Sequence, residues 1–271
     1  MNAGFGRPLS VNFKLIFRKA ASKCRKSLET GWQQITTLLF DFGGTLDRPG
    51  AHWLDRFLRH YGAAGIKLNR EELDPAFAYA TGRGYRAGAR IYGYGLRPLL
   101  DELVNWQIDY LIEHLPKRVP PSIRDSAPAI AASFCAESAA GYEQSRRILG
   151  ALASRFTIGV VSNFYGNLEP VLKEAGLATF VVAAIDSSRV GAFKPDPKIY
   201  QAALGRLNAR PEETAMVGDS LAKDCVPARR LGLRTVWLMP EGVEYTPQDE
   251  ASADLAVHNL HQLVEICLGV D

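Results

Sequence analysis

Acidic, hydroxyl and basic residues follow several short apolar runs of this chain. Asp41 comes directly after the run Leu38–Phe40, and a Gly-Gly pair and Thr45 come after it. Short apolar runs closed by glycine predict buried strands, and open α/β sheets gather their chemistry at the carboxyl ends of such strands. A carboxylate at that point can bind a hard cation or attack an electrophile. A loop aspartate that caps the next helix would look the same in sequence.

Three later stretches extend this pattern. Ser162 and Asn163 close the apolar run 157–161, Lys194 opens a Lys-Pro-Asp-Pro turn, and Asp219 follows the run 215–217 with Asp224 five residues further on. Taken alone, Lys194 is typical of an exposed lysine before a turn. Asp224 is equally typical of an acid at the start of a helix, where it interacts with the helix dipole. The order of the four stretches is more informative than any one of them.

Asp, Ser, Lys and a final pair of Asp, each near an apolar strand, resemble the four motifs of the haloacid dehalogenase-like (HAD) superfamily. The resemblance covers roughly residues 36–238. It implies that Asp41 attacks phosphorus and becomes an aspartyl phosphate. Ser162 would bind a phosphoryl oxygen and Lys194 would neutralise charge on the nucleophile and the transferring group. Thr45 and Asn163 would assist in substrate binding.

The same resemblance implies a magnesium site. Mg²⁺ would be held by the carboxylates of Asp41 and Asp219 and by the backbone carbonyl of Gly43, with Asp224 as a further partner. Magnesium prefers octahedral oxygen coordination and keeps several waters, which suits a site with so few protein ligands. A carbonyl ligand at residue 43 does not depend on the side chain there.

One position departs from the family pattern. Phosphatases of the family carry Asp-x-Asp-Gly-Thr in the first motif, but the second Asp is Gly43 here. That Asp protonates the leaving oxygen and later activates water, and general acid–base help of this kind contributes roughly 10² to 10⁴ in rate. His52, Asp47 and Asp55 are near in sequence and could replace it. Hydrolysis of a small phosphorylated metabolite is the favoured function, since the other motif residues are all present.

Two alternatives stay open at this point. Family members that cleave carbon–halogen or carbon–phosphorus bonds also lack this acid, the former usually with Tyr in its place and the latter with an imine-forming lysine. Lys67 and Lys117 are the lysines available for that role. The second alternative is a binding or scaffold protein with little turnover.

The elements that must position these residues alternate between strand and helix from about Arg155 onward. Alternation predicts a parallel sheet, and we expect a three-layer Rossmann-like α/β core. About a hundred residues with helical periodicity separate the first two strands, far more than a crossover needs. The resemblance identifies them as an inserted helical cap. The predicted domains are a basic extension (1–35), a core (36–50 and 136–271) and a cap (51–135).

Inside the predicted cap, residues 79–97 combine arginines, glycines and tyrosines without a single acid. Arginine forks suit phosphate and carboxylate groups. We therefore consider Arg83, Arg86 and Arg90 as an anion clamp that helps to choose the substrate. The alternative is a solvated surface segment whose tyrosines pack on the cap.

Composition sets the remaining bounds. The chain has 271 residues, 47% of them hydrophobic and 23% charged, with a net charge of +3, which gives no reason to expect a nucleic-acid partner. Its four scattered cysteines predict neither a zinc site nor a disulfide framework, and we expect a cytoplasmic protein. The basic residues 1–35 could contact a membrane surface or direct the chain to an organelle, but a surface helix is the simpler expectation.

Overall fold

The computed structural model describes residues 32–240, 242–243, 246, 249 and 252–269. The chain divides into two units, residues 1–35 and residues 36–271. The predicted basic segment, with its membrane or targeting role, lies almost entirely outside the described residues. None of the helices in the described ranges is long and apolar enough to cross a bilayer.

The second unit contains a six-stranded parallel sheet, as the alternation of elements predicts. Its order is β3-β2-β1-β4-β5-β6. The strands are β1 (Thr37–Phe40), β2 (Thr157–Ser162), β3 (Ala183–Asp186), β4 (Thr214–Gly218), β5 (Arg234–Leu238) and β6 (Leu255–Val257). The central strand β1 is buried throughout and pairs with β2 and β4 in register. Buried on both sides, it reads as an unbroken apolar run in sequence.

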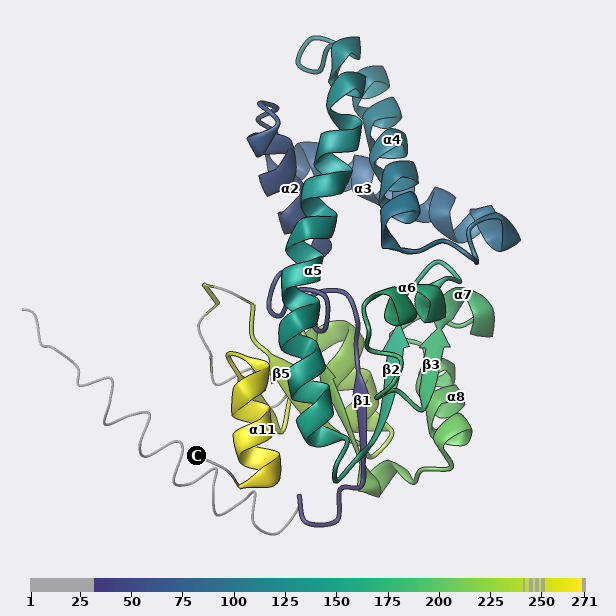
Figure 1. The fold of residues 1–271 in the computed structure, drawn as a ribbon, viewed down its shortest axis with the longest axis vertical. Coiled ribbons are helices and arrows are strands. Elements are labelled where there is room, and N and C mark those ends of the chain that lie inside the picture. Colours follow the sequence, from purple (N-terminus) through teal and green to yellow (C-terminus); the bar gives the residue numbers. More distant parts are fainter. Residues whose placement is uncertain (1–31, 241, 244–245, 247–248, 250–251, 270–271) are drawn as a thin grey trace, which may run out of the picture. The chain divides into compact units, whose positions relative to one another are not determined.

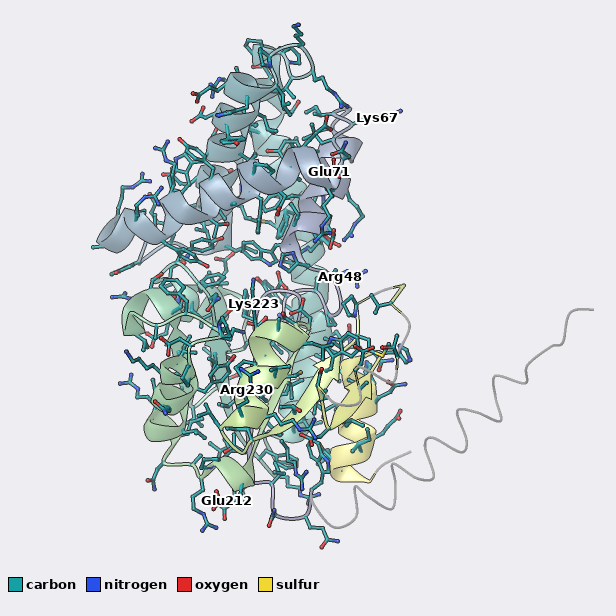
Figure 2. All side chains as sticks on the ribbon, turned by 180° about the vertical axis from the view of Figure 1, so that it is seen from behind. Arg48, Lys67, Glu71, Glu212, Lys223 and Arg230 are labelled. Atoms are coloured by element: carbon teal, nitrogen blue, oxygen red, sulfur yellow. The ribbon has the colours of Figure 1, made fainter. Side chains whose placement is uncertain are left out.

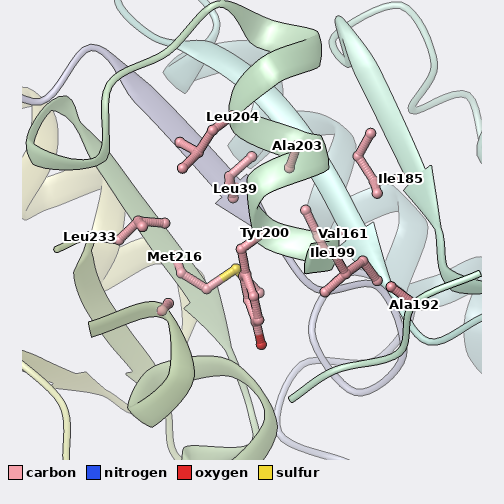
Figure 3. Close-up of a cluster of buried hydrophobic side chains, with 11 residues drawn as sticks. Leu39, Val161, Ile185, Ala192, Ile199, Tyr200, Ala203, Leu204, Met216 and Leu233 are labelled. Atoms are coloured by element: carbon pink, nitrogen blue, oxygen red, sulfur yellow. The ribbon is translucent and has the colours of Figure 1, made fainter. Parts of the chain in front are cut away.

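Helices flank this sheet and complete a Rossmann-like α/β domain (Figure 1). The helices of the sheet region are α6 (Leu168–Glu174), α7 (Ser187–Val190), α8 (Pro197–Leu207), α9 (Val226–Arg230) and α11 (Leu260–Leu268). Short helical turns lie at η3 (Pro211–Glu213) and η4 (Leu221–Cys225). Figure 3 shows Leu39 and Met216 packed against Tyr200 and Leu204 of α8, in a cluster from which water is excluded. Burial of such side chains is the main source of the stability of this layer.

A helical insertion separates β1 from β2. It consists of α2 (Trp53–Ala63), α3 (Arg70–Ala87), η1 (Gly88–Arg90), α4 (Leu96–His114), η2 (Pro121–Ser126) and the first part of α5 (Ala127–Leu152). Asn69 caps α3 in a reciprocal arrangement with Glu72, which ends the preceding loop sharply. Figure 1 shows α5 running from the insertion down to the sheet, where it lies beside α11.

The sequence-based boundaries differ from these elements in three places. Helix α5 begins at Ala127, so the domain boundary between residues 135 and 136, still a prediction, falls within a continuous helix. The strand β6 was not expected, because a three-residue strand gives almost no period-two signal. Asp224, typical in sequence of an acid at the start of a helix, lies on the π-type turn η4, just before α9.

Gly141 allows α5 to pass directly over the loop that follows β1. A Cβ atom at this position would lie 1.9 Å from the backbone oxygen of Asp47. We predict that Gly141→Ala lowers the free energy of unfolding by about 1–3 kcal/mol, because either the helix or the loop must shift. Urea unfolding of the full chain measures this.

Gly150→Ala is the matched control on the same helix. A Cβ atom there would make ordinary contact with Phe180, at 3.5 Å, and the position is exposed. It should raise the free energy of unfolding by up to about 1 kcal/mol, the gain in helix propensity. Equal effects of the two substitutions would show that the close approach of α5 to Asp47 contributes nothing.

Candidate active site

The three carboxylates of the sequence motifs meet at the carboxyl edge of the sheet. Asp41 follows β1, Asp219 follows β4, and Asp224 lies on η4. One oxygen of each lies within 4.8 Å of the others, and all three residues are at most 9% exposed. The parallel register aligns Phe40 with Val217, so Asp41 and Asp219 follow the carboxyl ends of two neighbouring strands.

Lys194 joins two of these carboxylates. Its Nζ donates to Oδ1 of Asp41 at 2.6 Å and to Oδ1 of Asp224 at 2.5 Å, and its side chain is 3% exposed. Burial lowers the pKa of Lys194, but the charges of Asp224 and Asp41 outweigh that effect and raise the pKa above its usual range. The lysine therefore stays protonated and holds Asp41 in place.

One ammonium does not balance three carboxylates. Burial, followed by the charges of Asp41 and Asp224, raises the pKa of Asp219 well above its usual range. Burial likewise raises the pKa of Asp224 to about 6, although Lys194 opposes the shift. This excess of buried oxygen donors fits a hard divalent cation, which would relieve the repulsion.

Ser162 and Thr45 bring hydroxyl groups to the same edge. Ser162 ends β2 and donates from Oγ to Oδ1 of Asp41 at 3.0 Å. Thr45 is fully buried, and its Oγ1 has no hydrogen-bond partner within the described ranges. A buried hydroxyl without a partner is costly, so a bound ligand or water is its natural complement.

Asn163 supports Lys194 from behind. Its Oδ1 accepts from the backbone N–H of Lys194 at 2.7 Å, and its Nδ2 donates to the backbone oxygen of Lys194 at 3.0 Å. Both ends of the amide are thus engaged. Asn163 therefore supports Lys194, and its role in substrate binding stays a prediction.

Two glycines let the backbone come close to the acids. Gly44 has φ of 84°, a left-handed conformation that favours glycine, and a Cβ there would lie 2.4 Å from Oδ2 of Asp219. A Cβ at Gly218 would lie 2.4 Å from Oδ2 of Asp224. Gly43 precedes Gly44 in the same turn, which places its peptide beside the cluster.

The arginines of the predicted clamp lie elsewhere. Arg83, Arg86 and Arg90 line a hollow together with Ala87 and Trp106. Arg83 donates to the hydroxyl of Tyr79 at 3.0 Å, and Arg90 to Oε1 of Glu102 at 2.7 Å. Within the described ranges, none of the contacts of these arginines reaches the carboxylates of Asp41, Asp219 or Asp224.

The opposite side of the same segment faces the sheet domain. A Cβ on Gly84 would lie 2.6 Å from the ring of Tyr165, and the ring of Tyr85 packs against Tyr165 and Phe193. Arg83 stands two residues before Tyr85 in α3, which places the two side chains on opposite sides of the helix. The predicted anion clamp therefore faces away from the contact that the insertion makes with the sheet domain.

Trp53 is a site residue that sequence reasoning missed. Its spacing from Phe57 and Tyr61 is helical, which in sequence is typical of a core residue. In the structure its indole lies beside Gly43, since a Cβ on that glycine would be 3.2 Å from the indole Nε1. A pairing between residues of different elements leaves no local signal in a single sequence.

Comparison with known proteins places the chain in a family. The family model of the haloacid dehalogenase-like hydrolases matches residues 35–232. The chain belongs to the haloacid dehalogenase-like hydrolases. This confirms the family resemblance of the four motifs and the α/β fold. Hydrolases of this family generally use a divalent metal, in keeping with the acidic cluster at residues 41, 219 and 224.

Individual relatives agree with this assignment. The chain is 27% identical over 202 residues to haloacid dehalogenase-like hydrolase domain-containing protein 3 of Danio rerio, with 73% of this chain and 82% of the relative covered. It is 43% identical over 90 residues to a phosphoserine phosphatase of Thermus thermophilus, covering 33% of this chain and only 35% of that enzyme. The HAD-hydrolase YfnB of Bacillus subtilis has a similar fold, with a TM-score of 0.53, 20% identity, and 86% and 98% of the two chains covered.

The repulsion within the cluster leads to a test of metal binding in this haloacid dehalogenase-like hydrolase. In the absence of divalent metal, we predict that Asp219→Asn is at least as stable as the wild type at pH 7, because it removes one buried charge. Magnesium should stabilise only the wild type, by about 2.7 kcal/mol at a concentration 100 times the dissociation constant. Thermal unfolding with and without MgCl₂ measures both effects.

The pH dependence has a defined sign. The folded protein binds the proton of Asp219 more tightly than the unfolded chain does, so without metal the wild type should lose stability relative to Asp219→Asn as pH rises above the ordinary value of 3.8. Asp74→Asn, at an exposed position of α3, is the control and should behave as wild type. A metal response that survives in Asp219→Asn would place the cation elsewhere.

Proposed function

We propose that this chain is a magnesium-dependent phosphatase that hydrolyses a small phosphorylated metabolite through an aspartyl phosphate on Asp41. The observation that carries the proposal is the position of Asp41, buried at the carboxyl end of β1 and contacted by Ser162 and Lys194. The similarity to a phosphoserine phosphatase supports phosphate chemistry. That match spans about a third of the relative, so the substrate itself is not carried over.

Each residue has a defined part in the proposed reaction. Asp41 offers a carboxylate oxygen to phosphorus, while Lys194, bonded to that carboxylate, balances charge as the phosphoryl group arrives. The Ser162 hydroxyl, now directed at Asp41, is free to rotate toward a phosphoryl oxygen. Asn163 keeps Lys194 in position through its backbone.

The cation would be held by Asp41, Asp219 and the carbonyl of Gly43, with Asp224 as a further partner. When bound, Mg²⁺ supplies neutralisation of negative charge on the phosphoryl oxygens. Thr45, whose hydroxyl has no partner in the described part of the chain, is available to a substrate oxygen. In this proposal the helical insertion acts as the cap that excludes water and shapes the substrate pocket. A role of Arg83, Arg86 and Arg90 in substrate choice stays a prediction.

An imine-forming lysine, as in carbon–phosphorus cleavage, has no support from the geometry. Lys67 and Lys117 are both exposed. Figure 2 shows Lys67 near the outer end of the helical insertion, far from Lys223, which directly precedes Asp224 of the cluster. Phosphoester hydrolysis is therefore favoured over that alternative, and a non-catalytic binding protein is the outcome to test against.

Hydrolysis of p-nitrophenyl phosphate with MgCl₂ tests the proposal, because this leaving group needs little protonation. We predict that Asp41→Asn lowers kcat/KM by at least about 10³-fold, since the nucleophile is lost. Ser162→Ala should cost about 10² to 10³ in kcat, the usual effect of losing one donor to a developing charge. Asp55 forms an exposed ion pair with Arg70, and Asp55→Asn should leave kcat and kcat/KM unchanged.

The contrary result is equally clear. If folded wild-type protein binds magnesium but releases no phosphate above the level of Asp41→Asn from any aryl phosphate, the phosphatase proposal is wrong. A binding role would then be the better interpretation of the same site.

A further inference from the structure

An indole occupies the space into which a side chain at residue 43 would extend. The nearest atoms to a Cβ built on Gly43 are Nε1, Cδ1 and Cε2 of Trp53, at 3.2, 3.5 and 3.7 Å. The first of these distances is tighter than ordinary van der Waals contact. A longer side chain at residue 43 could enter only if the indole moved.

The indole is held firmly by a buried carboxylate. Its Nε1 donates to Oδ2 of Asp47 at 2.6 Å, while Oδ1 of Asp47 accepts from the backbone N–H of Gly44 at 2.7 Å. Arg56 pairs with the same Oδ2, and both Asp47 and Arg56 are fully buried. One carboxylate thus ties the Gly43–Gly44 turn to the start of α2.

Aromatic packing and further bonds restrict the cluster from the other sides. The indole ring contacts Phe134 and Phe164, with ring centroids 5.2 and 6.0 Å apart. The guanidinium of Arg56 lies 3.7 Å above the centre of the Phe134 ring and also donates to Oγ of Ser138 at 2.6 Å. Displacing Trp53 would therefore disturb several buried contacts at once.

The acids near residue 43 are engaged in other roles. Both oxygens of Asp47 accept hydrogen bonds from the Gly44 backbone, Trp53 and Arg56, so this carboxylate is already engaged. Asp55 is paired with Arg70 on an exposed face. Neither replaces the missing acid of the first motif.

The other protic side chains in this region are weak acids. His52 accepts from the backbone N–H of Leu54 with Nδ1, and burial together with Lys223 lowers its pKa, so the ring is neutral. Burial raises the pKa of Tyr85 above its usual range. The hydroxyl of Tyr200 already donates to the backbone oxygen of Lys223.

We propose that Trp53 fills the place of the acid and restricts this chain to phosphorylated substrates whose leaving group departs without a proton, such as acyl phosphates and phosphates of acidic hydroxyls. The inference rests on the proposed phosphatase function and names its substrate class. Trp53 is then a specificity-determining residue, held in position by Asp47.

The two steps balance without a protein acid. An oxygen of Asp41 bonds to phosphorus, the bond from phosphorus to the leaving oxygen breaks, and the leaving group takes the electron pair as a carboxylate or phenolate. Water then bonds to phosphorus, the bond between Asp41 and phosphorus breaks with its electron pair returning to the carboxylate, and the proton of the water passes to solvent. With no base at residue 43, this second step is slow, so the phosphorylated enzyme accumulates.

Wild-type protein alone provides the first test. We measure kcat/KM with magnesium for acetyl phosphate, p-nitrophenyl phosphate, phenyl phosphate and phosphoserine. The kcat/KM for phosphoserine should be at least about 10²-fold lower than for the two activated substrates, acetyl phosphate and p-nitrophenyl phosphate. The reason is that general acid catalysis contributes roughly 10² to 10⁴ in rate. A burst of leaving group equal to the enzyme concentration, and one phosphoryl group on Asp41 in acid-quenched protein, should accompany turnover.

Variants then assign the effect to Trp53. Trp53→Leu stays apolar but has no atom at the position of Nε1, so Gly43→Asp/Trp53→Leu has room for a carboxyl group. In wild type, the gap is the ratio of kcat/KM for p-nitrophenyl phosphate to kcat/KM for phosphoserine. The double variant should reduce this ratio by at least about 10-fold. Trp53→Leu alone should leave the gap unchanged, because it adds no acid, and Gly43→Asp alone should narrow it less than the double variant does.

The outcomes separate this inference from the proposed function. If phosphoserine and the activated phosphates react at similar rates in wild type, and Asp41→Asn abolishes both, the phosphatase stands and the restriction is wrong. If Gly43→Asp alone closes the gap fully, Trp53 does not limit the site. If no substrate shows hydrolysis that depends on Asp41, the proposed function itself fails.

Discussion

The pairing of Lys194 with Asp41 and Asp224 is the interaction on which the site depends. It brings an ammonium from the loop before α8 to carboxylates that follow β1 and lie on η4, and it does so at almost complete burial. Separating these charges would leave each one unpaired in a medium of low dielectric, which is strongly destabilising. The loops at the carboxyl edge of the sheet are therefore fixed by the same contact that fixes the nucleophile.

The ammonium of Lys194 does not pair with all three carboxylates of the cluster. Two of the three carboxylates meet the ammonium, while Asp219 lies next to the glycine turn after β1. Repulsion retained in the folded protein lowers its stability, and sites that bind ions often carry such a cost because the ligand removes it. The excess of negative charge describes a site whose complement is a cation.

Much of this arrangement could be predicted from sequence, for a physical reason. Parallel strands buried on both faces are short apolar runs, and their carboxyl ends share one edge, so Asp41, Ser162 and Asp219 were expected to lie at the same edge of the sheet once the strands were located. The position of Lys194 followed only from the family resemblance. Nothing local distinguishes a lysine that folds back into a cluster from one that points to solvent.

The features that the sequence did not reveal share the opposite property. The composition of residues 79–97 predicts a clamp that includes Arg83 and Arg90, and this stays a prediction. Composition does not show, however, that one side of the segment packs on Tyr165 and the other holds the arginines. The helical spacing of Trp53 predicts a core residue, and Trp53 is buried, but its contact with Gly43 joins two elements. Such relations depend on which faces meet, a property that the order of residues does not contain.

The continuity of α5 has a consequence for the evolution and engineering of this protein. Its 26 residues belong to the insertion at one end and to the sheet domain at the other, without a break between them. Adding or deleting one residue before Gly141 would rotate everything upstream by about 100° about the helix axis and shift it by about 1.5 Å. Exchange of the insertion with that of a relative must therefore preserve the helical phase of α5. We expect changes in the length of α5 between the insertion and the sheet domain to come in whole helical turns.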